Sequence, residues 1–213
     1  MRRDLKINSK ATSQHWEIGL TGAKLDFNNR TKIENIEIDQ VGNYGDWRYA
    51  MAWISNDSIK FDGIVKGAAS VDTKSLNIGI EESQFYFADT LWTVNESSKI
   101  KYSKNKVSTS ISLKTVSQNI AFLFDGNIRD NTIDVEVSDF EFDNLSPWLS
   151  RIKSSIDGTV NGRLNRIQKN NIHQLNSSIQ TSQLIVNDYL FGALNIDVLS
   201  DSKNEIQNIV NNS

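Results

Sequence analysis

The sequence predicts an all-β protein built from a long meandering antiparallel sheet, with one short helix. Apolar and polar residues alternate along most of the chain, short polar turn clusters separate the alternating runs, and proline occurs once, at Pro147. Alternation places one apolar face on each strand. Short connections favour antiparallel neighbours. The fold class therefore follows from the period of the pattern and the length of its interruptions.

The strands are expected where apolar residues recur at every second position. In chain order these residues are Leu25 and Phe27, Ile36 and Ile38, Ile59 and Phe61, Ile78 and Ile80, Phe85 and Phe87, Ile100 and Tyr102, Ile111 and Leu113, Ile120, Phe122 and Phe124, Ile133, Val135 and Val137, Phe140 and Phe142, Leu184 and Val186, and Leu194, Ile196 and Val198. The clusters FNNRT, SNDS, SKNK, RDNT and QKNN are typical turn sequences. The segment Gln118–Val137 reads as a hairpin with one apolar face.

One helix is expected, near Pro147–Ser155. Ser146 suits the N-cap and Pro147 the first helical position. Shortly before it, the alternation changes parity near Ser138. A bulge or turn there would keep Val137 and Phe140 on one face, and a true change of face is the alternative.

Composition argues against several classes of function. The net charge of −3 argues against nucleic acid as a main partner. The absence of cysteine removes disulfides and thiolate metal sites. His15 and His173 lack companions at metal-ligand spacing. No window has the roughly 20 apolar residues of a spanning helix, and we expect the chain to be a piece of a longer protein. We expect no catalytic residue, cofactor or metal.

Three local clusters were weighed as sites. In DVEVSDFEFDN, alternation places Asp134, Glu136 and Glu141 opposite the apolar residues, which favours a solvated face over a paired-carboxylate site. The aromatic strand GDWRYAMAW, with Trp47 and Trp53 on one side, favours packing over a ligand-binding wall. The basic run KIKYSKNK favours an outer strand face over a contact with anionic headgroups.

The segment from Phe85 to about Val198 resembles the TamB family, the translocation and assembly module of bacterial envelopes. It carries the DTLW step, the strand ending in Asp-Gly, and the helix-like NLSPWL leading into IDGTVNGRL. The resemblance divides the chain into residues 1–84, which fit more loosely, and residues 85–213. It implies a curved sheet folded like a taco around an apolar groove. The N-terminal anchor and the C-terminal docking segment of whole family members are missing from this sequence.

The resemblance further implies a periplasmic bridge, with the full-length protein anchored in the inner membrane. Family members support phospholipid transport to the outer membrane and assembly of outer-membrane or secreted proteins. The implied partners are phospholipid and an outer-membrane BamA-type barrel protein. The residues expected to line the groove are Ile100, Ile111, Leu113, Ile120, Phe122, Phe124, Val135 and Val137.

Two alternatives stay open at this level. The same residues could face a second sheet in a closed sandwich, because both arrangements need one apolar face per strand. The second functional hypothesis is a carbohydrate-binding or adhesive β-sandwich or solenoid domain at the cell surface. It predicts exposed aromatic rings on a flat face near Trp47, Tyr49 and Trp53.

Overall fold

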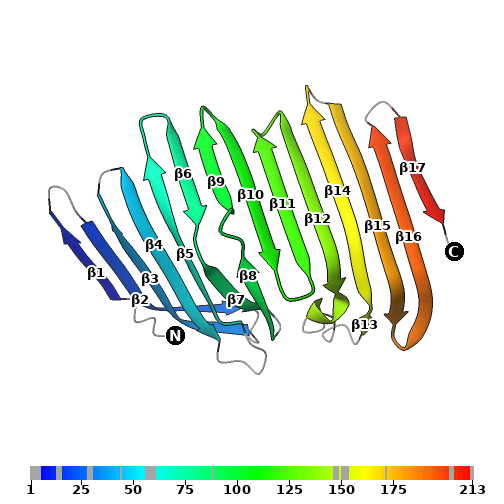
Figure 1. The fold of residues 1–213 in the computed structure, drawn as a ribbon, viewed down its shortest axis with the longest axis horizontal. Coiled ribbons are helices and arrows are strands. Elements are labelled where there is room, and N and C mark those ends of the chain that lie inside the picture. Colours follow the sequence, from blue (N-terminus) through cyan, green and yellow to red (C-terminus); the bar gives the residue numbers. More distant parts are fainter. Residues whose placement is uncertain are drawn as a thin grey trace. The chain divides into compact units, whose positions relative to one another are not determined.

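Figure 1 shows the fold in a computed structural model of the chain. The structure describes residues 6–12, 16–27, 31–43, 45–55, 61–87, 89–145, 149, 154–170, 172–201 and 204–211. Within these ranges most residues lie in antiparallel strands and no helix reaches seven residues, which confirms the predicted all-β class. The strands group into two compact units, residues 1–104 and 105–213. The predicted division after residue 84 falls inside the first unit.

The first unit is a meandering antiparallel sheet. Its strands are β1 (Lys6–Ala11), β2 (Trp16–Phe27), β3 (Thr31–Gly42), β4 (Asp46–Ser55), β5 (Gly63–Val71), β6 (Ser75–Ile80), β7 (Ser83–Phe87), β8 (Thr90–Val94) and β9 (Lys99–Ser103). Strands β1 to β5 each pair with the next strand. Beyond them, β5 pairs with both β6 and β7, while β6 pairs with β9 and β7 with β8.

The breaks between β6 and β7 and between β8 and β9 are closed by two buried serines. Ser83 Oγ accepts a hydrogen bond from the Lys66 N–H at 2.9 Å and donates to the Lys66 carbonyl at 3.3 Å. The Ser98 carbonyl accepts from the Ile80 N–H at 2.9 Å. Backbone groups that leave the regular ladder thus still find partners, as buried polar groups must.

The second unit is also one meander, and its strands follow one another in chain order (Figure 1). They are β10 (Lys106–Lys114), β11 (Asn119–Gly126), β12 (Asn131–Glu141), β13 (Ile156–Asp157), β14 (Thr159–Lys169), β15 (Ile172–Val186), β16 (Tyr189–Asp201) and β17 (Asn204–Asn211). Strand β12 pairs with β14, and β13 and β14 both pair with β15. The described strands of this unit therefore form a single sheet.

The predicted hairpin at Gln118–Val137 is confirmed. Phe122 of β11 lies opposite Val135 of β12. In the connecting turn the Asn127 side chain accepts hydrogen bonds from the N–H groups of Arg129 and Asp130, at 2.8 and 2.9 Å. An Asn side chain that caps its own turn in this way favours a tight reversal.

The parity change near Ser138 is a β-bulge. The register of β12 against β14 shifts between Val137 and Phe140, so Ser138 and Asp139 together oppose Asn161. Asp139 has a φ of 51°, and its N–H donates to Asn161 Oδ1 at 2.8 Å. The extra residue returns Phe140 to the face that carries Val137, which decides between the two readings of the sequence.

The predicted helix at Pro147–Ser155 lies mostly outside the described residues, as do Ile59 and His15. Within the helix range, Leu149 is helical, and its carbonyl accepts from the Ser154 N–H at 3.2 Å. A short 3₁₀ turn, η1 (Phe142–Leu145), precedes it.

Two buried amides tie η1 to the turn between β10 and β11. Asn144 Nδ2 donates to Gln118 Oε1 at 2.8 Å and to the Glu141 carbonyl at 3.0 Å. Both residues are almost fully buried. Buried amides that satisfy each other in this way hold two connections of the sheet together.

Candidate functional site: the apolar face of the second unit

One face of the second unit is apolar across six of its paired strands. Directly opposed residues in an antiparallel ladder project to the same side, so the register identifies the members. We call this surface the apolar face. It consists of Ile111, Leu113, Ile120, Phe122, Phe124, Ile133, Val135, Val137, Phe140, Val160, Leu164, Leu175, Ile179, Leu194, Ile196 and Val198.

Two rows of the apolar face cross the sheet from β10 to β16. The first row is Leu113, Ile120, Val137, Gly162, Ile179 and Ile196, and the second is Ile111, Phe122, Val135, Leu164, Ser177 and Val198. Neighbouring strands are about 4.8 Å apart, so five spacings give each row a length of about 24 Å. The apolar path runs across the strands and not along any one of them.

Seven of the eight predicted lining residues lie together on this face. They come from the adjacent strands β10, β11 and β12. Ile111, Leu113, Ile120, Phe122, Val135 and Val137 form direct cross-strand pairs with one another, and Phe124 pairs with Thr109 and Ile133. The eighth, Ile100, belongs to β9 in the first unit and pairs with Ile78. Its neighbours Lys99 and Lys101, from the basic run, are exposed on the opposite side of that strand.

The apolar face is only partly covered. Each of its members keeps an intermediate or larger share of its surface accessible, and none of the described apolar residues of the second unit is classed as buried. The members are covered mainly by one another, since the described strands form a single layer. A sandwich core would bury such residues between two sheets.

The opposite face of the same strands is polar. Asp134 accepts hydrogen bonds from Arg163 Nη2 at 2.8 Å and from Asn165 Nδ2 at 3.2 Å. The bond from Arg163 is the main reason that the pKa of the Asp134 carboxyl is below its ordinary value. Glu136 and Glu141 are exposed. These carboxylates thus lie on the solvated side of the sheet, as the alternation predicted.

One charged residue interrupts the apolar face. Arg166 in β14 lies opposite Ile133 in β12 and Leu175 in β15. It is half-buried, and its Nη2 donates to Gln168 Oε1 at 2.8 Å. The next position outward on this face carries Gln168 itself, opposite Asn131 and His173. Arg166 therefore stands at the border between the apolar face and a polar margin.

The sequence-based selection of lining residues omitted the part of the face that lies on β14, β15 and β16. In β14 and β15 the apolar positions are diluted by Gly162, Ser177, Thr181 and Arg166, which weakens the alternation. In β16 the alternation of Leu194, Ile196 and Val198 is plain. Only the strand register shows that the apolar side chains of these three strands project to the same face of the sheet as Phe122.

In the first unit, the predicted aromatic strand packs over glycines. Tyr49 lies opposite Gly67 and Trp53 opposite Gly63. A Cβ at Gly67 would come within 2.3 Å of the Tyr49 hydroxyl oxygen. Burial, followed by the charge of Glu81, raises the pKa of the Tyr49 hydroxyl, which donates to the Gly79 carbonyl at 3.3 Å. The rings thus cover bare backbone, which supports the packing interpretation.

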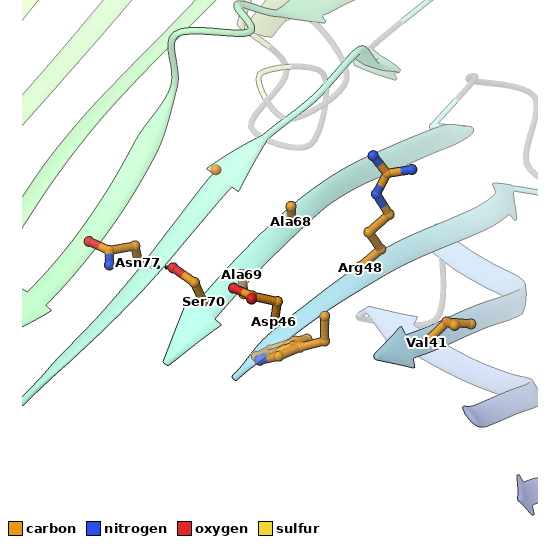
Figure 2. Close-up of a pocket in the computed structure, with 9 residues that line it drawn as sticks. Val41, Asp46, Arg48, Ala68, Ala69, Ser70 and Asn77 are labelled. Carbon is orange, nitrogen blue, oxygen red and sulfur yellow. Dashed lines mark hydrogen bonds between the residues drawn. The ribbon is translucent and has the colours of Figure 1, made fainter. Parts of the chain in front are cut away.

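The opposite face of the first unit has a shallow depression of about 320 Å³ (Figure 2). Its floor contains Ala68 and Gly79, and the exposed Arg48 lies in the same row, opposite Ala68. Asp46, Ser70 and Asn77 line its other side. The depression arises because small side chains sit beside larger ones. Its lining residues do not provide the convergent buried polar groups that are typical of a small-molecule site.

Comparisons with known proteins do not identify a relative. No protein-family model, no curated protein and no solved structure matches the chain. Among the described residues there is also no helix with the length and apolar character needed to cross a bilayer. Inference about function therefore depends on the geometry of the apolar face.

Proposed function

We propose that the chain is a segment of a TamB-like scaffold that shields lipid acyl chains on the apolar face of its sheet. The observation that carries this proposal is the extent of the partly exposed apolar surface, which crosses six strands of one layer. An apolar patch of this extent on a soluble domain marks a surface that contacts another apolar partner. A hydrocarbon chain is the partner that the family resemblance indicates.

The energetics suit transport better than tight binding. Removing acyl chain from water gains about 0.8 kcal/mol per CH₂, or roughly 13 kcal/mol for a chain of about 16 carbons. Rows made mostly of Ile, Leu, Val and Phe offer part of that gain along the face without directional contacts. A chain can therefore shift along the face with little change in free energy. This role requires no catalytic residue, cofactor or metal.

The wider role follows from the resemblance. We place the segment in the periplasm of a bacterium with an outer membrane, within a protein anchored in the inner membrane. There it would support movement of phospholipid to the outer membrane and the assembly of outer-membrane or secreted proteins. An outer-membrane BamA-type barrel protein is the protein partner that the resemblance indicates. The taco-like closure of the sheet around the groove remains a prediction.

The alternative, a carbohydrate-binding or adhesive domain, draws less support from the aromatic strand. The rings of Trp47 and Tyr49 are tilted by 56° with centroids 6.3 Å apart, so they do not form a flat platform for a sugar ring. Trp53 donates its indole N–H to the Phe61 carbonyl and packs over Gly63. These rings serve the packing of their own sheet.

Photocrosslinking from adjacent residues on opposite faces tests the proposal. A benzophenone amino acid at Phe122 would lie on the apolar face, and the same group at Leu123 would lie on the polar face, where Leu123 is 48% exposed. In a bacterium with two membranes, we expect glycerophospholipid adducts from position 122 and few or none from position 123. The two positions differ by one residue, so expression and labelling are matched.

The outcome at position 122 decides the proposal. Absence of lipid adducts there, while protein crosslinks form efficiently, would reject lipid shielding. Equal adducts from both positions would show that the lipid contact is unspecific. A third probe at Trp47 covers the alternative, because glycan adducts from that position would favour the carbohydrate-binding domain.

A further inference from the structure

The position of Arg166 is unusual because it puts a cationic side chain at the edge of an apolar surface. Its cross-strand neighbours are Ile133 and Leu175, and Leu164 precedes it on the same face of β14. The side chain is half-buried. Burying part of a charged group among aliphatic side chains costs free energy unless a partner compensates for the lost water.

Arg166 has no anionic partner among the described residues. Its only hydrogen bond there is to the neutral amide of Gln168, at 2.8 Å. Arg163, three residues earlier and on the opposite face, shows the usual arrangement, since two of its nitrogens donate to the Asp134 carboxylate. A guanidinium has five N–H donors, so Arg166 retains donors that nothing in the described sheet engages.

The surroundings of Arg166 match the shape of an amphiphile. On one side lie the two apolar rows, of which the nearer includes Val135 and Leu164. On the other side lies the polar row of Asn131, Gln168 and His173. A molecule with an anionic group and a hydrocarbon chain could place the group at Arg166 and lay the chain over the rows. Guanidinium binds phosphate and carboxylate through two parallel hydrogen bonds, and such charge-assisted bonds are strong.

We propose that Arg166 is the headgroup-binding residue of the apolar face and engages the phosphate or carboxylate of an anionic amphiphile whose hydrocarbon chain lies on the adjacent rows. The site rests on the proposed function, since it needs the apolar face to hold hydrocarbon. It adds a fixed position for the ligand to that function. The apolar face can hold the hydrocarbon chain anywhere along its rows, whereas Arg166 determines where the charged group of the ligand binds.

The test compares three probes on the purified full chain. Dodecyl phosphate carries both chain and anion, dodecanol carries the chain alone, and inorganic phosphate carries the anion alone. Binding of the two amphiphiles is measured by displacement of the uncharged dye diphenylhexatriene, below the concentration at which they aggregate. Binding of inorganic phosphate is measured by calorimetry. The variants are Arg166→Gln, Arg166→Lys and, as the matched control on the opposite face, Arg163→Gln.

We expect wild-type protein to bind dodecyl phosphate more tightly than dodecanol. Arg166→Gln should weaken dodecyl phosphate by about tenfold, the size of one charge-assisted contact, and leave dodecanol unchanged. Arg166→Lys should retain part of the preference, because it keeps the charge but loses the bidentate geometry. Arg163→Gln should alter neither affinity. Circular dichroism of each variant confirms that the sheet is intact.

The outcomes separate this inference from the function on which it rests. If dodecanol binds and the preference for dodecyl phosphate survives Arg166→Gln, the inference is wrong while hydrocarbon binding stands. If inorganic phosphate binds at Arg166 as tightly as dodecyl phosphate, the residue holds a free anion and the inference is again wrong. If neither amphiphile binds wild-type protein, both the inference and the proposed function fail.

Discussion

The two units share one architecture, a meandering antiparallel sheet, but they differ in how they cover their apolar side chains. All four apolar residues that are classed as buried, Ile36, Ala69, Trp92 and Val94, belong to the first unit. The second unit carries the apolar face, and none of its described apolar residues is classed as buried. A similar alternating pattern in the sequence thus buries a few apolar side chains in one unit and none of the described ones in the other.

The two units also differ in the residues placed opposite some of their large side chains. In the first unit, glycine lies opposite Tyr49 and Trp53, so each ring folds down over backbone. In the second unit, large residues oppose one another, as Phe122 does between Ile111 and Val135. Side chains in direct cross-strand pairs contact one another. A glycine opposite a ring lets the ring cover backbone, but pairing alone does not decide burial, because Trp92 lies opposite Phe85 and is 2% exposed.

The largest expected effect distinguishes a covered aromatic residue from an open one. Trp92 is 2% exposed, and Trp92→Ala should lower the stability of β7 and β8 by about 3–5 kcal/mol, the usual range for a fully buried aromatic residue. Phe122→Ala should cost β11 less, on the order of 1–2 kcal/mol, because Phe122 is less completely buried than Trp92 and part of the ring is already in water. Hydrogen exchange, read out strand by strand, measures both local stabilities.

Equal losses at the two positions would contradict the comparison. A loss at Phe122 as large as that at Trp92 would mean that a second layer covers the apolar face. The proposed lipid contact would then have no accessible surface. Adding detergent to the Phe122→Ala experiment sharpens the result, because an apolar ligand that binds the face should protect β11 in wild-type protein more than in the variant.

The next effect concerns the glycines. Gly63→Ala would place a Cβ within 2.3 Å of the Trp53 ring and 2.6 Å of Phe85 Cβ, so the ring must move off the backbone. We expect a loss of about 1–3 kcal/mol, typical of overpacking. The matched change in the second unit is Gly162→Ala, where the nearest atom, the Ser178 carbonyl oxygen, is 3.1 Å away. It should be close to neutral, because Ala restricts the unfolded chain and needs only a small shift.

Thermal unfolding and Trp fluorescence of both glycine variants check this prediction. We expect the fluorescence of Trp53 to change and the unfolding temperature to fall in Gly63→Ala, and neither to change in Gly162→Ala. If Gly162→Ala were the more damaging substitution, the apolar face would be packed more tightly than the large-to-large pairing implies. Gly162→Ala also adds a methyl group between Val137 and Ile179 in one apolar row, so it should not reduce dodecanol binding.

The sequence was informative wherever the alternation is undiluted. Ile120, Phe122 and Phe124 followed by RDNT and Ile133, Val135 and Val137 predicted a hairpin that the structure confirms. Strands β14 and β15 were harder, because Arg166, Ser177 and Thr181 occupy positions of the apolar face. The residue that we propose to bind the headgroup is thus one of those that obscured the pattern.

Features that depend on register could not be predicted. That Tyr49 would lie on Gly67 follows from a pairing of two strands, and a shift by one residue would expose the ring to the other face. The bulge at Ser138 was visible as a parity change, but its resolution depends on Asp139 adopting a φ of 51° and bonding to Asn161 in the next paired strand. Non-local contacts of this kind leave no signal in the local alternation.

The smallest expected effect concerns the polar face and its dependence on pH. In the folded chain the hydrogen bond from Arg163 holds the pKa of Asp134 below its ordinary value of 3.8, which we take for the unfolded chain. A carboxyl with a lowered folded-state pKa stabilises the fold above its unfolded pKa, and that contribution is lost as the pH falls through the folded-state pKa. Because Arg163 is largely exposed, solvent and salt keep the effect small.

The acid limb of the unfolding profile measures this contribution. Between about pH 5 and about pH 2, the urea midpoint of wild-type protein should fall more steeply than that of Asp134→Asn, which has no charge to lose. Asp125→Asn is the matched control, since Asp125 is exposed on the same face and its interactions in the described structure include no ion pair. The urea midpoint of Asp125→Asn should therefore fall with pH as steeply as that of wild-type protein. If Asp134→Asn did the same, the ion pair would add no stability, and the polar face would serve only to keep that side of the sheet in water.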